Sequence, residues 1–231
     1  MTYVLHYAPD NASLIVRLAL EHRGLPYRTA LVDRAARAQD SAAYRRLNPN
    51  GLIPVLETPQ GPLFETAAIL LWLNDTHGGL GPDPDAPGRG AFLKWLFYLS
   101  NTTHALFRQL FYTHRYIGAD HVAALRDGLA RQIARSFATL DTLADDPAAW
   151  PGTDMPGALD FYLSALLRWS ALYPRDWDRA WFALSDYPAL HDLCTRIEAL
   201  PCTAVLQRAE GLGDTPFTAP QPPNPPEGSA T

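Results

Sequence analysis

The chain has 231 residues, of which 47% are hydrophobic, and this suffices for one large domain or two smaller ones with a buried core. Its formal net charge is −5, and the positive charges are scattered arginines with Lys94 as the single lysine, which argues against a nucleic-acid-binding surface. No apolar run approaches the roughly 20 residues of a membrane-spanning helix, so we expect neither nucleic acid nor a membrane as a partner.

The first part of the chain alternates strand-like and helix-like segments. Runs of β-branched and aromatic residues predict strands at residues 2–7, 27–32, 54–58 and 62–64. Apolar spacing and alanine-rich composition predict helices at residues 12–24, 33–47 and 66–79. A right-handed βαβ crossover followed by a hairpin gives a small mixed sheet with helices on its faces, which is an α+β domain.

A segment dense in proline and glycine, residues 80–90, separates this part from the rest. Beyond it we find no convincing strand. Apolar residues recur at steps of three and four within residues 92–110, 125–140 and 190–200, and residues 158–169 are apolar on most sides. We therefore predict an all-α helical bundle after the linker.

The predicted division is an α+β domain at residues 1–79, a linker at 80–90, an all-helical domain at 91–213 and a proline-rich end at 214–231. The proline-rich end is predicted to be either a disordered tail or a strap over the surface.

The N-terminus lacks the basic and apolar regions of a secretion signal. We therefore expect a cytoplasmic protein, in which the two cysteines, Cys194 and Cys202, stay reduced rather than forming a disulfide. The seven histidines are dispersed, and neither CxxC nor HExxH occurs, so no metal site is predicted. The arginine- and alanine-rich composition is typical of bacterial genomes rich in G and C.

The segment GLIPVLETPQGPLFETAAILLWL, residues 51–73, places a proline at the head of a strand, then a hairpin, then the pair Glu65-Thr66 at the start of a helix. In this order and spacing the segment resembles a glutathione S-transferase, and the resemblance extends over residues 2–213. It implies a thioredoxin-like N-terminal domain, an all-helical C-terminal domain, glutathione as co-substrate and a homodimer.

The resemblance implies that a cis peptide bond precedes Pro54 and turns the main chain of Ile53 toward the cysteinyl unit of glutathione. Proline has no N–H to lose there, and the cis form of such a bond costs only about 0.5–1 kcal/mol. The alternative is a trans proline at the first position of a strand, which needs no ligand.

Glu65 and Thr66 stand where a helix offers unsatisfied amides at the positive end of its dipole, which favours an anion. The resemblance implies that Thr66 binds the γ-glutamyl carboxylate through its hydroxyl and N–H, and that Glu65 lies near the ammonium of the ligand. Ordinary helix capping by this pair is the alternative.

The thiol of glutathione has to become a thiolate, and the activating donor is expected within HYAPDNASLIVR, residues 6–17. This stretch is most similar to the bacterial beta class, whose pattern it matches at Tyr7, Pro9, Ser13 and Leu14. The cysteine of that pattern is Ala12 here, and this removes mixed-disulfide chemistry.

Our candidates for the donor are Asn11 and Ser13 first, then Tyr7. Each has a structural alternative, since Asn11 or Ser13 could simply cap the helix and Tyr7 could be a core residue. An aspartate at position 10 would repel a thiolate if it faced the ligand.

In the second part of the chain, SNTTHALF matches a beta-class pattern whose histidine reaches over the domain cleft toward glutathione. The match falls on His104, and the alternative is a histidine on the surface of a helix. Asp160 matches the folding motif of the family and is assigned to capping the core helix, although the usual serine or threonine partner is Gly157.

The main functional prediction is therefore a glutathione transferase, a detoxification enzyme that directs the glutathione sulfur at a small hydrophobic electrophile. A glutathione-dependent isomerase, dehalogenase or peroxidase is one alternative. Another is a non-catalytic binding or scaffold protein, which Ala12 and Asp10 favour. A thioredoxin-type disulfide exchanger is excluded because the first helix has no cysteine.

Overall fold

The computed structural model describes residues 2–146, 149–150 and 155–230. Its N-terminal part is a mixed sheet in the order β2-β1-β3-β4. β1 and β2 are parallel, β3 is antiparallel to β1, and β4 is antiparallel to β3. The strands are β1 Tyr3–Tyr7, β2 Tyr27–Leu31, β3 Val55–Thr58 and β4 Gly61–Phe64. The predicted small mixed sheet is confirmed.

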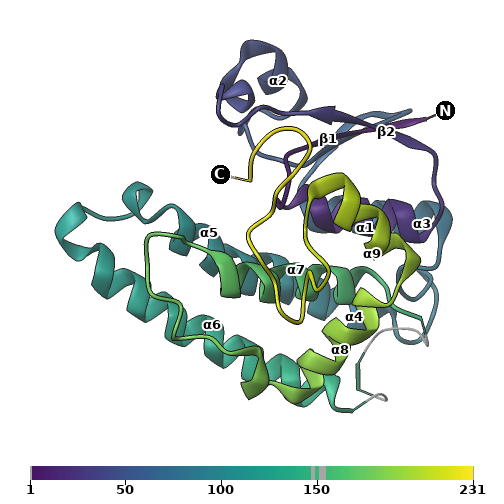
Figure 1. Ribbon diagram of the computed structural model, residues 1–231. Helices are drawn as coiled ribbons and strands as arrows, with labels where there is room; N and C mark the ends of the chain where they lie inside the picture. Colours follow the sequence, from purple (N-terminus) through teal and green to yellow (C-terminus); the bar gives the residue numbers. More distant parts are fainter. Residues whose placement is uncertain (1, 147–148, 151–154, 231) are drawn as a thin grey trace.

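The helices of this domain cover both faces of the sheet (Figure 1). α1, Ser13–His22, and α3, Thr66–His77, lie on the face toward the helical domain, and α2, Ala42–Leu47, lies on the other face. The predicted helix over residues 33–47 is wrong in its first half. The chain there forms turns and a short 3-10 segment at Ala38–Asp40, because Arg37 adopts a left-handed conformation with φ 53°.

The C-terminal part is all-helical, as the sequence predicts. Its longer helices are α4 Arg89–Phe97, α5 His104–Phe111, α6 Val122–Ala144, α7 Ala158–Leu172, α8 Pro188–Glu198 and α9 Pro201–Glu210. Short 3-10 turns occur at Thr113–Arg115, Ala119–His121 and Leu184–Asp186. Within the described residues, none of the helices is both long enough and apolar enough to cross a membrane.

A π-helical segment, Tyr98–Thr103, joins α4 to α5. The sequence predicts one regular helix here, with Leu106 on the buried face. The wider turn shifts that face, so that Phe107 is fully buried while Leu106 is only partly buried. A π-helical turn adds a residue to the helix without ending it.

α7 is the core helix of the molecule, and its start explains a departure from the family motif. Asp160 accepts a hydrogen bond of 2.8 Å from the N–H of Gly157. A Cβ atom on Gly157 would lie 2.4 Å from the carbonyl oxygen of Leu80, which also accepts the N–H of Ala158. The linker thus approaches the helix so closely that a serine or threonine cap does not fit.

α9 has no counterpart in the sequence-based prediction, which ends the last helix at residue 200. The helical pattern breaks there because Pro201 begins a new helix. α9 packs against α1 and so joins the two domains. Cys194 and Cys202, which lie in α8 and α9, are buried free thiols.

Residues 214–230 form a strap over the surface, called the C-terminal strap below (Figure 1). Phe217 is 1% exposed, and its N–H and that of Thr218 both donate to the Glu198 carboxylate at 2.6 Å. Farther along, the N–H of Asn224 donates to the carbonyl oxygen of Gly211 at 2.8 Å. These contacts fix the first two thirds of the strap to the helical domain.

Candidate functional site

The peptide bond between Ile53 and Pro54 is cis. The carbonyl oxygen of Leu52 is held by the Tyr44 hydroxyl and the Asn48 side-chain amide, each at 2.9 Å, while Pro54 is buried. The main-chain N–H and C=O of Ile53 itself make no hydrogen bond with any described residue. The chain is thus anchored on both sides of a residue whose own main chain is unpaired.

Glu65 and Thr66 form the junction between β4 and α3. Glu65 has φ 70°, which a side-chain-bearing residue adopts at a cost of order 1–3 kcal/mol and mostly at functional sites. Its side chain does not cap α3, so the capping alternative does not describe it. The hydroxyl of Thr66, a residue only 6% exposed, makes no hydrogen bond within the described part of the chain. The pair therefore offers free donors at a helix N-terminus.

His104 lies at the boundary between the two domains. Its Nδ1 is 2.9 Å from the Tyr162 hydroxyl, and its ring packs at 5.5 Å from that of Trp169. Burial and the nearby Arg108 lower the pKa of His104 to about 4, so the ring is neutral at neutral pH. The pKa of Tyr162 is raised by burial and by the Glu65 carboxylate.

Ser13 is the first residue of α1, and its hydroxyl is hydrogen-bonded to the loop before the helix. The hydroxyl donates to the carbonyl oxygen of Ala8 at 3.0 Å and accepts the N–H of Ala8 at 3.3 Å. The residue is fully buried. Its only O–H is therefore engaged, and only its main-chain N–H remains as a donor.

Asn11 precedes α1 and is partly exposed. Its Oδ1 accepts the N–H of Ala12 at 2.9 Å, and its main-chain carbonyl accepts the N–H of Leu14 at 2.8 Å. These two bonds orient the side chain. Its Nδ2 group has no partner among the described residues, so it is a positioned donor beside the N–H of Ser13.

Tyr7 ends β1 and is 2% exposed. Its hydroxyl donates a hydrogen bond of 2.5 Å to Glu227 of the C-terminal strap, and the Arg17 guanidinium lies 5.4 Å from the centre of its ring. Burial and the hydrogen bond to Glu227 raise the pKa of Tyr7. The phenol is therefore protonated, and its proton is donated to the strap.

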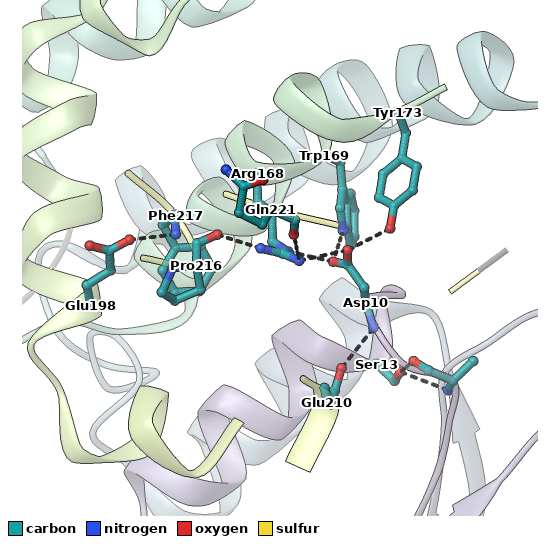
Figure 2. A network of polar contacts seen from close by, with 11 residues as sticks. Asp10, Ser13, Arg168, Trp169, Tyr173, Glu198, Glu210, Pro216, Phe217 and Gln221 are labelled. Atoms are coloured by element: carbon teal, nitrogen blue, oxygen red, sulfur yellow. Dashed lines mark hydrogen bonds and ion pairs between the residues drawn. The ribbon is translucent and has the colours of Figure 1, made fainter. Parts of the chain in front are cut away.

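The carboxylate of Asp10 is buried and bound by side chains of the protein itself. Figure 2 shows it enclosed by side chains of α7. Arg168 donates to its two oxygens at 2.8 and 3.1 Å, the Trp169 indole donates at 3.0 Å, and the Tyr173 hydroxyl donates at 2.7 Å. Asp10 and Arg168 both have fully buried side chains.

The N–H of Asp10 donates to Glu210 at the end of α9, at 2.9 Å. Glu210 also pairs with Arg17 at 3.3 Å and is completely buried. Burial raises the pKa of Glu210 to about 7. Sequence reasoning missed Arg168 and Glu210, because no local pattern distinguishes them from other charged residues of helices.

A cavity of about 340 Å³ lies beside Leu52, between the α2 region and the end of the helical domain. Its polar lining includes Arg37, Arg45, His114 and Arg115. Arg37 and Arg45 share Asp40 at 2.8 and 3.0 Å, so the cavity carries excess positive charge. It can attract an anionic group next to the free main chain of Ile53.

Known proteins are similar to this chain in sequence. A family model described as the N-terminal domain of glutathione S-transferase matches residues 12–76. A glutathione S-transferase of Xanthomonas campestris is 30% identical over 210 residues, which are 90% of this chain and 98% of that protein.

Solved structures have the same fold. A sphingomonad glutathione S-transferase complexed with glutathione is 27% identical, with a TM-score of 0.74, covering 91% of this chain and 100% of the other. A bacterial beta class enzyme from Sphingomonas chungbukensis is 25% identical, with a TM-score of 0.74, covering 90% and 98%. Because the relative from Xanthomonas is matched along nearly its whole length, the chain belongs to the glutathione S-transferase family.

Proposed function

We propose that this protein is a glutathione transferase, which binds glutathione between its two domains and directs the sulfur at a small hydrophobic electrophile. The observation that carries the proposal is the set of unpaired polar groups around Ile53, Glu65 and Thr66. Buried or half-buried polar groups are normally hydrogen-bonded in folded proteins, so a cluster without partners supports a polar ligand.

Each unpaired group matches a part of the tripeptide. The main chain of Ile53 can pair with the cysteinyl unit as a neighbouring strand would. The hydroxyl and N–H of Thr66 can bind the γ-glutamyl carboxylate, while the Glu65 carboxylate attracts the ammonium beside it. The remaining end of the peptide, the glycyl carboxylate, then belongs in the cavity with Arg37 and Arg45.

Activation of the thiol is assigned to Asn11 Nδ2 and the N–H of Ser13. A free thiol has a pKa of about 8.5, and lowering it by two units requires about 2.7 kcal/mol in favour of the thiolate. One oriented side-chain donor and one helix N-terminal amide are of the strength needed. The thiolate then forms a bond to the electrophilic carbon, and the leaving group departs with its electron pair.

Binding and activation are tested separately. Calorimetry with glutathione measures binding, and the ultraviolet absorbance of the thiolate, followed over pH, gives the pKa of the bound thiol. We expect Asn11→Ala to raise that pKa by about one unit. Ser13→Ala is the matched control, because it keeps the N–H and removes a hydroxyl that already points at Ala8. The assignment fails if Asn11→Ala leaves the pKa unchanged.

A glutathione-binding protein without catalysis is the second candidate. Ala12 in place of the beta-class cysteine and the engagement of Tyr7 by the strap favour it. Binding with no thiolate band near neutral pH would support this candidate. An isomerase, dehalogenase or peroxidase would show the band and differ only in the acceptor.

A cytoplasmic homodimer is part of the proposal. The two buried free thiols are in keeping with a reducing compartment. Phe97 on α4 is 49% exposed, and its burial against a second copy would remove a large apolar side chain from water. Sedimentation of the wild-type chain and of Phe97→Ser tests this, and a monomer in both cases contradicts it.

A further inference from the structure

We propose that the end of the C-terminal strap is autoinhibitory, and that it has to leave the cleft before the thiol is activated and the acceptor enters. This inference rests on the proposed glutathione transferase function. The part concerned is residues 225–230, called the strap end below.

The strap end bridges the two domains. The carbonyl oxygen of Ala230, a residue only 7% exposed, accepts a hydrogen bond from the Arg34 guanidinium. The same guanidinium donates to the Tyr112 hydroxyl at the end of α5, at 3.1 Å. The strap end therefore fills space between the strand end of the N-terminal domain and the helical domain.

Gly228 lies against Leu31, which ends β2, and against Pro9, in the loop between β1 and α1. Its φ is 71°, and a Cβ atom there would lie 2.7 Å from Leu31 Cδ1 and 3.3 Å from Pro9 Cδ. Pro9 precedes Asp10 and Asn11 in the loop that carries the proposed donor. The positive φ favours glycine, and the strap end packs closely on Leu31 and Pro9 at this point.

Glu227 opposes a thiolate in two ways. It takes up the only O–H of Tyr7, so this phenol cannot donate to a sulfur anion while the strap is seated. It also adds a carboxylate at the end of β1, and β1 lies beside β3, whose first residue follows Pro54. A nearby negative charge disfavours the formation of a second one.

The strap is held unevenly. Its first part is bound to buried groups, because Arg168 donates to the carbonyl oxygens of Pro216 and Gln221 at 2.8 and 3.1 Å (Figure 2). The strap end is bound to other groups, since the exposed Glu227 is bonded to Tyr7 and Ala230 is bonded to Arg34. The strap end can thus detach while the earlier part stays anchored, and this is the arrangement that a reversible cover needs.

The test compares the full chain with a truncated chain that ends at Asn224 and with Gly228→Val. The truncation retains the anchors at Pro216, Phe217 and Gln221, and the valine displaces the strap end by steric clash. Gly213→Val is the matched control, because Gly213 directly precedes the strap and has φ 81°, but nothing lies within 4 Å of its Cβ position. Each protein is measured for glutathione affinity, for the pKa of the bound thiol and for kcat/KM with chlorodinitrobenzene.

We expect truncation and Gly228→Val to lower the pKa of the bound thiol by about half a unit to one unit, and to raise kcat/KM by about threefold to tenfold. Gly213→Val should behave like the full chain. Unchanged or lower kcat/KM in variants that still bind glutathione overturns the autoinhibition and leaves the proposed function intact. If neither the full nor the truncated chain binds glutathione, the proposed function itself fails, and the inference fails with it.

A second measurement follows the strap end directly. Cys194 and Cys202 are buried, so a cysteine introduced by Ala230→Cys would be the reactive thiol of the folded protein. We expect it to be alkylated slowly in the otherwise unchanged chain and at least about tenfold faster when combined with Gly228→Val. Equal rates in the two proteins would show that the strap end is not seated, and would overturn the proposal.

Discussion

Two regions of the N-terminal domain differ in how their polar groups are paired. Around Ile53 and Thr66, main-chain and hydroxyl groups have no partners among the described residues. At Asp10 and Ser13, by contrast, the carboxylate and the hydroxyl are hydrogen-bonded within the protein itself. Both regions carry residue types that bind ligands, so residue type alone does not separate a site from a structural network. What separates them is whether the fold has left the group unpaired.

Among the tests of this contrast between paired and unpaired groups, Asp10→Asn has the largest expected effect. The substitution keeps the shape of the side chain but leaves the buried Arg168 without a counter-charge, which we expect to lower the free energy of unfolding by about 3–5 kcal/mol. Chemical denaturation measures it. Asp176→Asn is the control, because this partner of Arg126 is 73% exposed and its loss should cost less than about 1 kcal/mol. Equal losses of unfolding free energy in the two variants would show that the Asp10 network stabilises the fold no more than the exposed ion pair does.

The second test uses pH and Glu210. Burial raises its pKa from 4.5 to about 7, so between these values the folded state holds more protons than the unfolded state. The contribution of Glu210 to the free energy of unfolding therefore falls as pH rises through this window, by up to about 3 kcal/mol. Glu210→Gln should flatten the pH dependence of denaturation. Asp192→Asn is the control, because the side chain of Asp192 is 78% exposed and its substitution should leave the pH dependence unchanged. A steep pH dependence of denaturation in the Glu210 variant would contradict our account.

In the unpaired region around Ile53 and Thr66, Thr66→Ala should weaken glutathione binding by about tenfold to a hundredfold. A hydrogen bond to a charged group contributes about 1.5–3 kcal/mol, and this hydroxyl has no partner to lose among the described residues. Calorimetry with Thr66→Ser, which keeps the hydroxyl, supplies the comparison. If the alanine variant binds as tightly as the serine variant, the carboxylate is not bound at Thr66.

The smallest expected effect belongs to His104. Its pKa of about 4 keeps the ring neutral, so a contact with the tripeptide would be a neutral hydrogen bond, and His104→Gln should weaken binding by about tenfold or less. The affinity for S-methylglutathione should stay flat between about pH 5.5 and 7.5. A step near pH 6.5 that disappears in the glutamine variant would mean that the histidine titrates in contact with the ligand.

The outcome for individual residues shows what sequence reasoning can reach. The strands and α3 follow from local composition and turn residues, and the segment from Gly51 to Leu73 is specific enough to indicate the family. The hydrogen bonds of Asp10 join residues about 160 positions apart, and Tyr7 meets Glu227 across 220 positions. No local pattern carries such pairings. Helix propensity also overstated residues 33–37, where a left-handed Arg37 redirects the chain.

The choice among the candidate donors also depends on contacts that the local sequence does not show. Asn11, Ser13 and Tyr7 are equivalent in the sequence as polar residues at the right place. Only the three-dimensional structure shows that the Ser13 hydroxyl is hydrogen-bonded to Ala8 and that the Tyr7 hydroxyl is hydrogen-bonded to Glu227 of the strap. A side chain's partners depend on its rotamer and on distant segments, and neither is encoded in a short window of sequence.

The π-helical turn at Tyr98–Thr103 sets how α5 is rotated relative to α4. Each residue of an α-helix rotates the following ones by about 100°. Deleting one residue from this turn would let α4 and α5 run on as a regular helix, and would swing His104 away from the Tyr162 hydroxyl to which it is bonded. One extra residue in a helix thus sets which side chain of α5 meets Tyr162, and an insertion or deletion here would change that contact while α7 stays in place.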